Sequence, residues 1–210
     1  IGVFFLHATA LLALLPLIAR ALPGGGAGSF TLLLAAMGSG AILSVLLMPR
    51  IRRLMHLQQL VAAGTLMYAA GALLVAHAPS LWTAVPAMFA CGMAWITVAN
   101  AITVAAQMAL PDWVRARGMS IYQMAIMGAS AAGAAVWGQL ATATSVHTAL
   151  GTAAVTCVLI MVLAQRLMPE EARTENLTRT QRIQPREASV LPEAGRRVLT
   201  RIEYRIDPAR

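Results

Sequence analysis

The residue in this sequence best suited to proton chemistry is His7, which lies within the apolar run Gly2–Ala19. Imidazole is the side chain that ordinarily changes charge near neutral pH, so a histidine here could take part in proton coupling. Ionisable residues inside membrane segments are functional candidates, because burying them in lipid is costly. The alternative is a histidine that is hydrogen-bonded at a helix contact or lies near the membrane interface. No acidic residue lies in any apolar run, so a coupling carboxylate would have to come from elsewhere.

A second pattern with chemical potential is Gly38-Ser39-Gly40, since a serine of this kind with a histidine elsewhere could suggest an intramembrane protease. A serine nucleophile needs its base within hydrogen-bonding distance, and His7 is the one histidine far from the end of an apolar run. Close helix packing is the simpler interpretation of the two glycines. Cys91 and Cys157 lie inside apolar runs and lack the spacing of metal ligands. We therefore predict no catalytic residue, metal site or cofactor.

Six apolar segments carry these residues, and each is long enough to cross a bilayer. A spanning helix needs about 20 mainly apolar residues. The runs are continuous and do not alternate with polar residues, so they predict helices within residues 1–168 and not the strands of a membrane barrel. The predicted spans are Gly2–Ala19, Ser29–Met48, Leu57–Ala76, Leu81–Leu110, Met119–Ala141 and Val146–Leu167.

Charge divides the chain near residue 169. Only 11% of the residues are charged, whereas a soluble domain has about 25%. Residues 1–169 contain seven Arg and one acid, Asp112, while residues 170–210 contain nine Arg and seven acids. The net charge of +8 does not indicate nucleic-acid binding, because the chain has no basic stripe with interleaved aromatic residues.

The polar tail is predicted to have two parts. Residues 169–197 include Pro185 and Pro192 and are typical of a flexible cytoplasmic linker. Residues 198–210 predict the start of a soluble domain, because Val198–Ile206 alternates as a half-buried strand does. A lone strand is not stable, so we expect this domain to be truncated.

Arginine gathers after the second, fourth and sixth spans. Short loops rich in arginine stay on the cytoplasmic side of a membrane. The opposite loops hold only Arg20, His77 and His147, so an even number of spans places both ends of the chain in the cytoplasm. The chain has Arg but no Lys, which suggests a GC-rich bacterial genome. We expect a multi-pass protein of the bacterial cytoplasmic (inner) membrane.

Small residues at a spacing of four predict close helix packing in the second and fifth spans. Lipid chains are as apolar as leucine, so membrane helices associate where small residues let their backbones approach. The predicted packing residues are Ala36, Gly40, Ser44, Gly133 and Gly138.

The most specific motif is Leu110–Gly118, followed by Ser120, Tyr122-Gln123, Gly133 and Trp137-Gly138. It resembles the loop between the tenth and eleventh helices of major facilitator superfamily transporters. The resemblance is closest to the bacterial branch that includes the enterobactin exporter.

Two further segments are similar to parts of the same branch. Gly38–Ala41 through Leu47–Arg50 resembles the end of helix eight. Val198–Arg210 resembles the start of a cytoplasmic extension that looks like a small ferredoxin-like domain related to antibiotic-biosynthesis monooxygenases. The resemblance implies that the spans are helices seven to twelve, the C-terminal half of a transporter whose N-terminal six-helix half is missing from this chain.

This resemblance implies a fold and a function. The fold is an all-α membrane protein, the six-transmembrane-helix half of a major facilitator superfamily fold, followed by a polar tail ending in one β-strand. The function is secondary active transport, not catalysis: export of drugs, siderophores or similar amphiphilic molecules by alternating access, with protons as a possible coupling ion. The alternative is a membrane anchor or sensor for a cytoplasmic ligand-binding domain.

In this family the first, second, fourth and fifth helices of each half line a central cavity. Asn100 and Gln107 share one helix face, so an interhelix hydrogen bond is an alternative to substrate contact there. Trp95 either stacks on a ligand or lies in the core or against lipid. The candidate cavity residues are His7, Thr9, Ser39, Asn100, Thr103, Gln107, Gln123 and Ser130.

The resemblance also implies a cytoplasmic gate or latch. Asp112 either caps the next helix or pairs with Arg115. The alternative is that these charges act only as topology signals. The candidate latch residues are Arg50, Arg52, Arg53, Asp112, Arg115 and Arg117.

Overall fold

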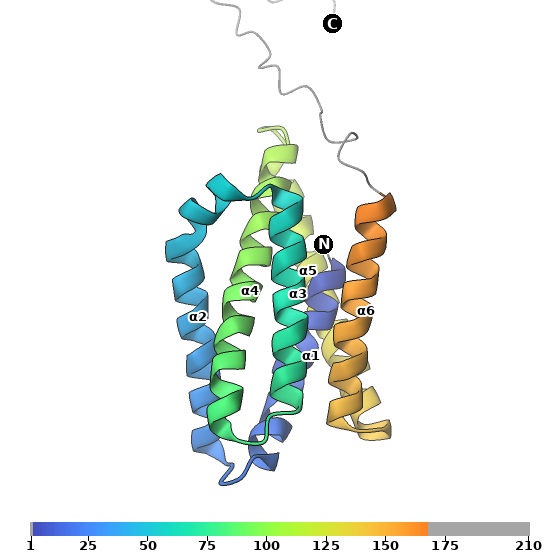
Figure 1. The fold of residues 1–210 in the computed structure, drawn as a ribbon. Coiled ribbons are helices and arrows are strands. Elements are labelled where there is room, and N and C mark those ends of the chain that lie inside the picture. The colour runs from blue at the N-terminus through green and yellow to red at the C-terminus, as the bar shows by residue number, and fades with distance from the viewer. Residues whose placement is uncertain (1, 168–210) are drawn as a thin grey trace, which may run out of the picture. The chain divides into compact units, whose positions relative to one another are not determined.

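The computed structural model describes residues 2–167, which form six antiparallel helices (Figure 1). Each helix is long and apolar enough to cross a membrane, so the prediction of an all-α membrane domain with six spans is confirmed. The predicted linker, 169–197, and the predicted strand segment, 198–210, lie outside the described residues. The helices are α1 (Gly2–Ala21), α2 (Ala27–Leu54), α3 (Leu57–Ala76), α4 (Leu81–Ala109), α5 (Arg115–Ala143) and α6 (Val146–Leu167).

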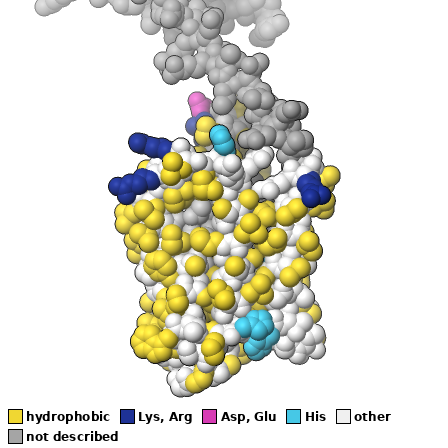
Figure 2. Space-filling model, viewed as in Figure 1, with side chains coloured by type: hydrophobic (Ala, Val, Ile, Leu, Met, Phe, Trp, Pro, Cys, Tyr) yellow, Lys and Arg dark blue, Asp and Glu magenta, His cyan; other side chains and the backbone are white. Residues whose placement is uncertain are grey.

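Two helices extend beyond their predicted spans at one end of the bundle, which we call the Arg-rich end. Residues 50–53, predicted in a loop, lie in the last turns of α2, and residues 115–117 lie in the first turn of α5. The predicted spans ended where charged residues began, but arginine is a good helix former, so the helices continue past the apolar core. The Arg-rich end carries Arg50, Arg52, Arg53, Arg115, Arg117 and Arg166, and is at the top of Figure 2.

Most of the main contacts join helices that are not consecutive in the chain, and the α3–α4 contact is the exception. α1 packs against α5 and α6, α2 packs against α4, and α3 packs against both α4 and α6. In Figure 1, α1 and α5 lie behind α3 and α6. The helix α2 therefore packs mainly against α4, and α5 packs mainly against α1.

The contact between α2 and α4 brings the two backbones together at a pair of glycines. A Cβ atom added to Gly40 would overlap the carbonyl oxygen of Phe89. One added to Gly92 would overlap the carbonyl oxygen of Met37. Neither position has space for a side chain, so this interface depends on direct backbone contact.

A buried polar pair lies one turn along the same interface. The hydroxyl oxygens of Ser44 and Thr97 are 2.8 Å apart. Because the Thr97 hydroxyl donates to the carbonyl oxygen of Met93 at 2.7 Å, the Ser44 hydroxyl is the donor in the pair. Ala36 is buried on the same face of α2. Hydrogen bonds of this kind in membrane proteins contribute about 0.6 kcal/mol.

The contact between α1 and α5 centres on the carbonyl group of Leu6. A Cβ atom added to Gly133 would overlap this carbonyl oxygen. One turn later in α5, the indole Nε1 of Trp137 donates to the same oxygen at 2.9 Å. Gly133 therefore creates the space that Trp137 uses to hydrogen-bond across the helices.

Aromatic side chains fill the core where α1, α3 and α4 meet. The rings of Phe4, Phe5, Tyr68 and Trp95 have centroids 5.5–6.2 Å apart. The Tyr68 hydroxyl donates to the carbonyl oxygen of Ala8 at 2.6 Å, which satisfies its polar atom. Trp95 thus lies in the core, one of the placements that the sequence left open.

The surface between the two ends is largely apolar. In Figure 2, the Arg and acidic side chains lie near the upper end, histidines lie near both ends, and the face between them shows yellow apolar and white side chains with no charged one. Large residues such as Leu74 in α3 and Leu159 in α6 are 64% and 61% exposed. Exposed leucines are stable in lipid and costly in water, so this surface suits a bilayer.

Candidate functional site

The eight candidate cavity residues divide into two groups by their contacts. His7, Asn100 and Thr103 contact side chains of other helices. The other five are partly or fully exposed, and within residues 2–167 no side-chain hydrogen bond joins them to another helix. The two hydroxyl groups on α1 and α2 donate to carbonyl oxygens of their own helices, at 2.7 and 2.8 Å. We call these five residues the open polar set: Thr9, Ser39, Gln107, Gln123 and Ser130.

His7 and Thr9 lie on opposite faces of α1. Residues two positions apart in an α-helix are separated by about 200° around its axis. Thr9 is partly exposed, whereas His7 is 8% exposed and its ring centroid lies 5.4 Å from that of Trp137. The Nδ1 atom of His7 lies 2.7 Å from the carbonyl oxygen of Val3. The histidine therefore points into the bundle, and its proton-coupling role stays a prediction.

A small cavity lies beside His7 between α1, α3 and α6. Its volume is about 10 Å³, and Tyr68, Cys157 and small apolar side chains complete its lining. This is space for about one water molecule, whereas sites for drug-sized ligands have volumes of about 300–1,000 Å³. The cavity beside His7 is therefore too small to hold a transported molecule.

Asn100 forms a contact between α2 and α4 at the Arg-rich end. The Arg52 guanidinium donates to the Asn100 side-chain oxygen at 2.6 Å and to its backbone carbonyl oxygen at 3.4 Å. A hydrogen bond from a charged donor is stronger than one between neutral groups. Of the two roles predicted for Asn100, an interhelix hydrogen bond or substrate contact, the structure shows the interhelix hydrogen bond. Its partner, Arg52, was predicted only as part of the latch.

Thr103 forms a contact between α4 and α5. Its hydroxyl oxygen lies 2.9 Å from that of Tyr122. Since Thr103 donates its own proton to the carbonyl oxygen of Ala99 at 2.7 Å, Tyr122 is the donor. Tyr122 was identified from the sequence only as part of a family motif. A buried tyrosine needs a hydrogen-bonding partner, and that need could have pointed to this contact.

The candidate latch contains one ion pair at the surface. A guanidinium nitrogen of Arg115 lies 2.6 Å from the Oδ1 atom of Asp112. The Asp112 side chain is 88% exposed and the Arg115 side chain is 47% exposed. Arg115 also donates to the carbonyl oxygen of Leu110 at 3.3 Å. Val114, and not Asp112, is the residue before the first turn of α5. An ion pair this exposed contributes little to stability.

α2 and α5 present wide faces without partners in the described chain. Seven of the 28 residues of α2 and four of the 29 residues of α5 are buried. A Cβ atom added at Gly38, Gly128 or Gly138 would meet no atom within 4 Å. At Gly138, which is partly buried and was predicted to pack against a helix, a side chain would therefore meet no other helix among residues 2–167.

The comparison with known families decides what this bundle is. A major facilitator superfamily family described as transmembrane secretion effector matches residues 2–210. The chain belongs to this family. It is therefore a membrane transporter of the major facilitator superfamily type. No curated protein and no solved structure matches the chain.

Transporter family membership argues against the protease interpretation of Ser39. In the structure, the Ser39 hydroxyl is exposed and donates to Ala36 of its own helix. His7 is buried against Trp137. Among the described hydrogen bonds, none joins a serine to a histidine, and a nucleophile depends on such a contact.

Proposed function

We propose that this transporter exports amphiphilic small molecules, such as drugs or siderophores, across the bacterial inner membrane by alternating access. The observation that carries this proposal is the open polar set, five polar side chains on α1, α2, α4 and α5. Exposed polar groups in lipid are costly, so they indicate a face that meets water, substrate or protein. The word secretion in the family description favours outward transport.

The chain supplies one half of the transporter in this proposal. A second six-helix half covers the unpartnered faces of α2 and α5, and the substrate binds between the halves. In such transporters one repeat rocks against the other around a binding site near the membrane midplane. The small cavity beside His7 cannot serve as this site because it holds about one water molecule.

The arginine distribution supports an orientation. Arg-rich short loops remain cytoplasmic, and the Arg-rich end holds six of the seven Arg residues of the described chain. We therefore place this end in the cytoplasm and the end with His77 and His147 on the opposite side. His7 is the only acidic or basic side chain well inside a described span, so it is the proton-binding candidate of this half.

A pair of matched variants tests the open polar set in the full-length transporter. Thr9→Trp adds a bulky ring to the open face of α1, while Thr152→Trp adds it to an exposed position of α6. Both hydroxyls donate only to their own helices, at 2.7 Å for Thr9 and 2.8 and 3.0 Å for Thr152. Loss of either hydroxyl therefore removes only hydrogen bonding within one helix. The two variants differ in the face of the bundle that carries the added tryptophan.

The assay measures accumulation of a panel of fluorescent amphiphiles in bacteria without their main efflux pumps, and transport in proteoliposomes with and without a proton gradient. We expect the wild type and Thr152→Trp to lower accumulation equally, and Thr9→Trp to abolish this effect. Absence of transport by the wild type across the panel would overturn the proposed function. Equal transport activity of the two variants would show that the open polar set does not line the binding site.

A further inference from the structure

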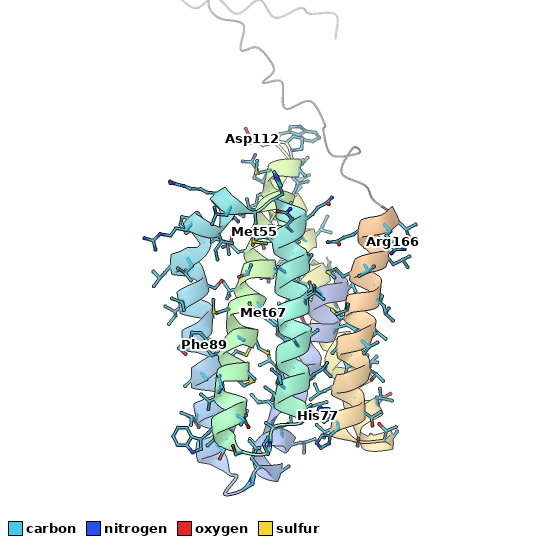
Figure 3. All side chains as sticks on the ribbon, in the orientation of Figure 1. Met55, Met67, His77, Phe89, Asp112 and Arg166 are labelled. Atoms are coloured by element: carbon cyan, nitrogen blue, oxygen red, sulfur yellow. The ribbon has the colours of Figure 1, made fainter. Side chains whose placement is uncertain are left out.

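Two histidines meet at the end of the bundle opposite the Arg-rich end. The ring centroids of His77 and His147 are 5.5 Å apart, with an angle of 64° between the ring planes. His77 directly follows α3, and His147 is the second residue of α6. Both side chains are exposed, and His77 is labelled at the lower end of α3 in Figure 3. The pair therefore joins two helices that pack against each other.

The hydrogen bond of His77 leaves one nitrogen of its ring free to bind a ligand. Its Nδ1 atom lies 3.0 Å from the carbonyl oxygen of Leu73, so Nδ1 is the protonated nitrogen and Nε2 carries the free lone pair. Histidines that bind metals commonly donate their other N–H group to a backbone carbonyl, which fixes the tautomer and the ring orientation. His77 already has this arrangement.

The separation of the rings fits a shared metal ion. Two imidazoles that bind one tetrahedral ion at about 2.0–2.1 Å have ring centroids about 5 Å apart. The observed separation is 5.5 Å, and the exposed ring of His147 can turn to direct a nitrogen at the point that the Nε2 atom of His77 faces. We propose that His77 and His147 bind one divalent transition-metal ion, Cu²⁺ or Zn²⁺, with water as the remaining ligands.

The ligand set predicts the strength and selectivity of the site. Imidazole suits Cu²⁺ and Zn²⁺, and Cu²⁺ binds more tightly in the general order of divalent metals. Within residues 2–167 no group of three or more His, Cys, Asp or Glu side chains could hold a metal. The site is therefore open, and it binds more weakly than a structural zinc site with four protein ligands.

The two helix ends beside the proposed site act on a bound ion in opposite directions. The C-terminal end of α3 attracts a cation, whereas the N-terminal end of α6 repels one. The side-chain oxygen of Ser145 accepts the backbone N–H of Thr148 at 3.1 Å, which satisfies one exposed donor of α6. The two helix ends oppose each other, so metal binding depends mainly on the two imidazoles.

A bound ion would connect α3 to α6 without touching the open polar set, which lies on the other four helices. The site is therefore an accessory one, and its expected effect is to stabilise the α3–α6 contact. This inference does not depend on the proposed export function, because metal binding can be measured without a transported substrate.

The test uses the full chain, purified in detergent through a tag without histidine and freed of metal by a chelator. Calorimetry measures Cu²⁺ and Zn²⁺ binding, and electron paramagnetic resonance counts the nitrogens bound to Cu²⁺. We expect one ion per chain, two coupled nitrogens and a higher unfolding temperature with metal. His77→Gln and His147→Gln should each remove one nitrogen and weaken binding by about tenfold or more.

His56→Gln is the control, because His56 is an exposed histidine at the other end of α3. This variant should keep both coupled nitrogens and the wild-type affinity. Far-UV circular dichroism shows that each variant is folded, and His77→Ala and His147→Ala replace any Gln variant that is not. The proposal is overturned by unchanged affinity and nitrogen count in the folded His77 and His147 variants, or by loss of binding in His56→Gln.

Discussion

Replacing Gly40 with Ala tests whether α2 and α4 are held by direct backbone contact. The added Cβ would overlap the carbonyl oxygen of Phe89 and lie 2.9 Å from the carbonyl carbon of Phe89 and 3.2 Å from the backbone nitrogen of Met93. These are all backbone atoms of α4, so they cannot rotate away as the end of a side chain can. The two helices must separate, and the folded state must lose stability.

Two opposing effects set the size of this loss. Alanine favours the helical state over glycine by about 1 kcal/mol. Overpacking costs about 1–3 kcal/mol, and weakening of the Ser44–Thr97 hydrogen bond adds about 0.6 kcal/mol. The expected result is a net loss of about 0.6–2.6 kcal/mol in the free energy of unfolding.

Gly38→Ala is the matched control on the same helix. A Cβ atom at Gly38 meets no atom within 4 Å, so only the gain in helix propensity remains. The free energy of unfolding is measured for this chain in micelles by titration with a denaturing detergent, followed by tryptophan fluorescence. The reasoning fails if Gly40→Ala is as stable as Gly38→Ala.

Three further predictions concern contacts elsewhere in the bundle. Trp137→Phe removes the hydrogen bond to Leu6, and we expect a loss of about 1 kcal/mol in the free energy of unfolding in the same assay; an unchanged free energy would contradict a role of this hydrogen bond in stability. Tyr122→Phe and Thr103→Val should each cost about 0.6 kcal/mol, and the double variant should cost less than their sum; full additivity would show that the two hydroxyls do not interact. Both cysteines are buried, so a membrane-permeable maleimide should label neither until the chain is unfolded, and rapid labelling of the folded chain would contradict their burial.

The spans could be predicted because a continuous apolar run has few stable arrangements other than a helix across the bilayer. Leu57–Ala76 and Val146–Leu167 form helices with the predicted bounds. The ends of α2 and α5 could not be predicted in the same way. Hydropathy reports where the apolar core ends, but a helix ends where its backbone hydrogen bonds end, and Arg50–Arg53 continue them.

The side-chain contacts were less predictable than the spans. The partner of Asn100 lies 48 residues away in sequence, and no local pattern identifies Arg52 as that partner. The positions of His7 and Thr9 did carry a signal, because a spacing of two places residues on opposite faces of a helix. This spacing indicates that the side chains of His7 and Thr9 do not both line one cavity.

Two closely packed helix pairs, α2 with α4 and α1 with α5, indicate where movement can occur during the proposed alternating access. α2 is fixed to α4 at Gly40 and Gly92, and α1 is fixed to α5 at Gly133, in each case by contact with backbone atoms. Close-packed contacts of this kind do not compress, so each pair should move as a rigid unit. α4 and α5 share few contacts, and the Thr103–Tyr122 hydrogen bond joins them. Relative movement inside this half should therefore occur between the pairs, at the α4–α5 junction, while the contacts within each pair persist.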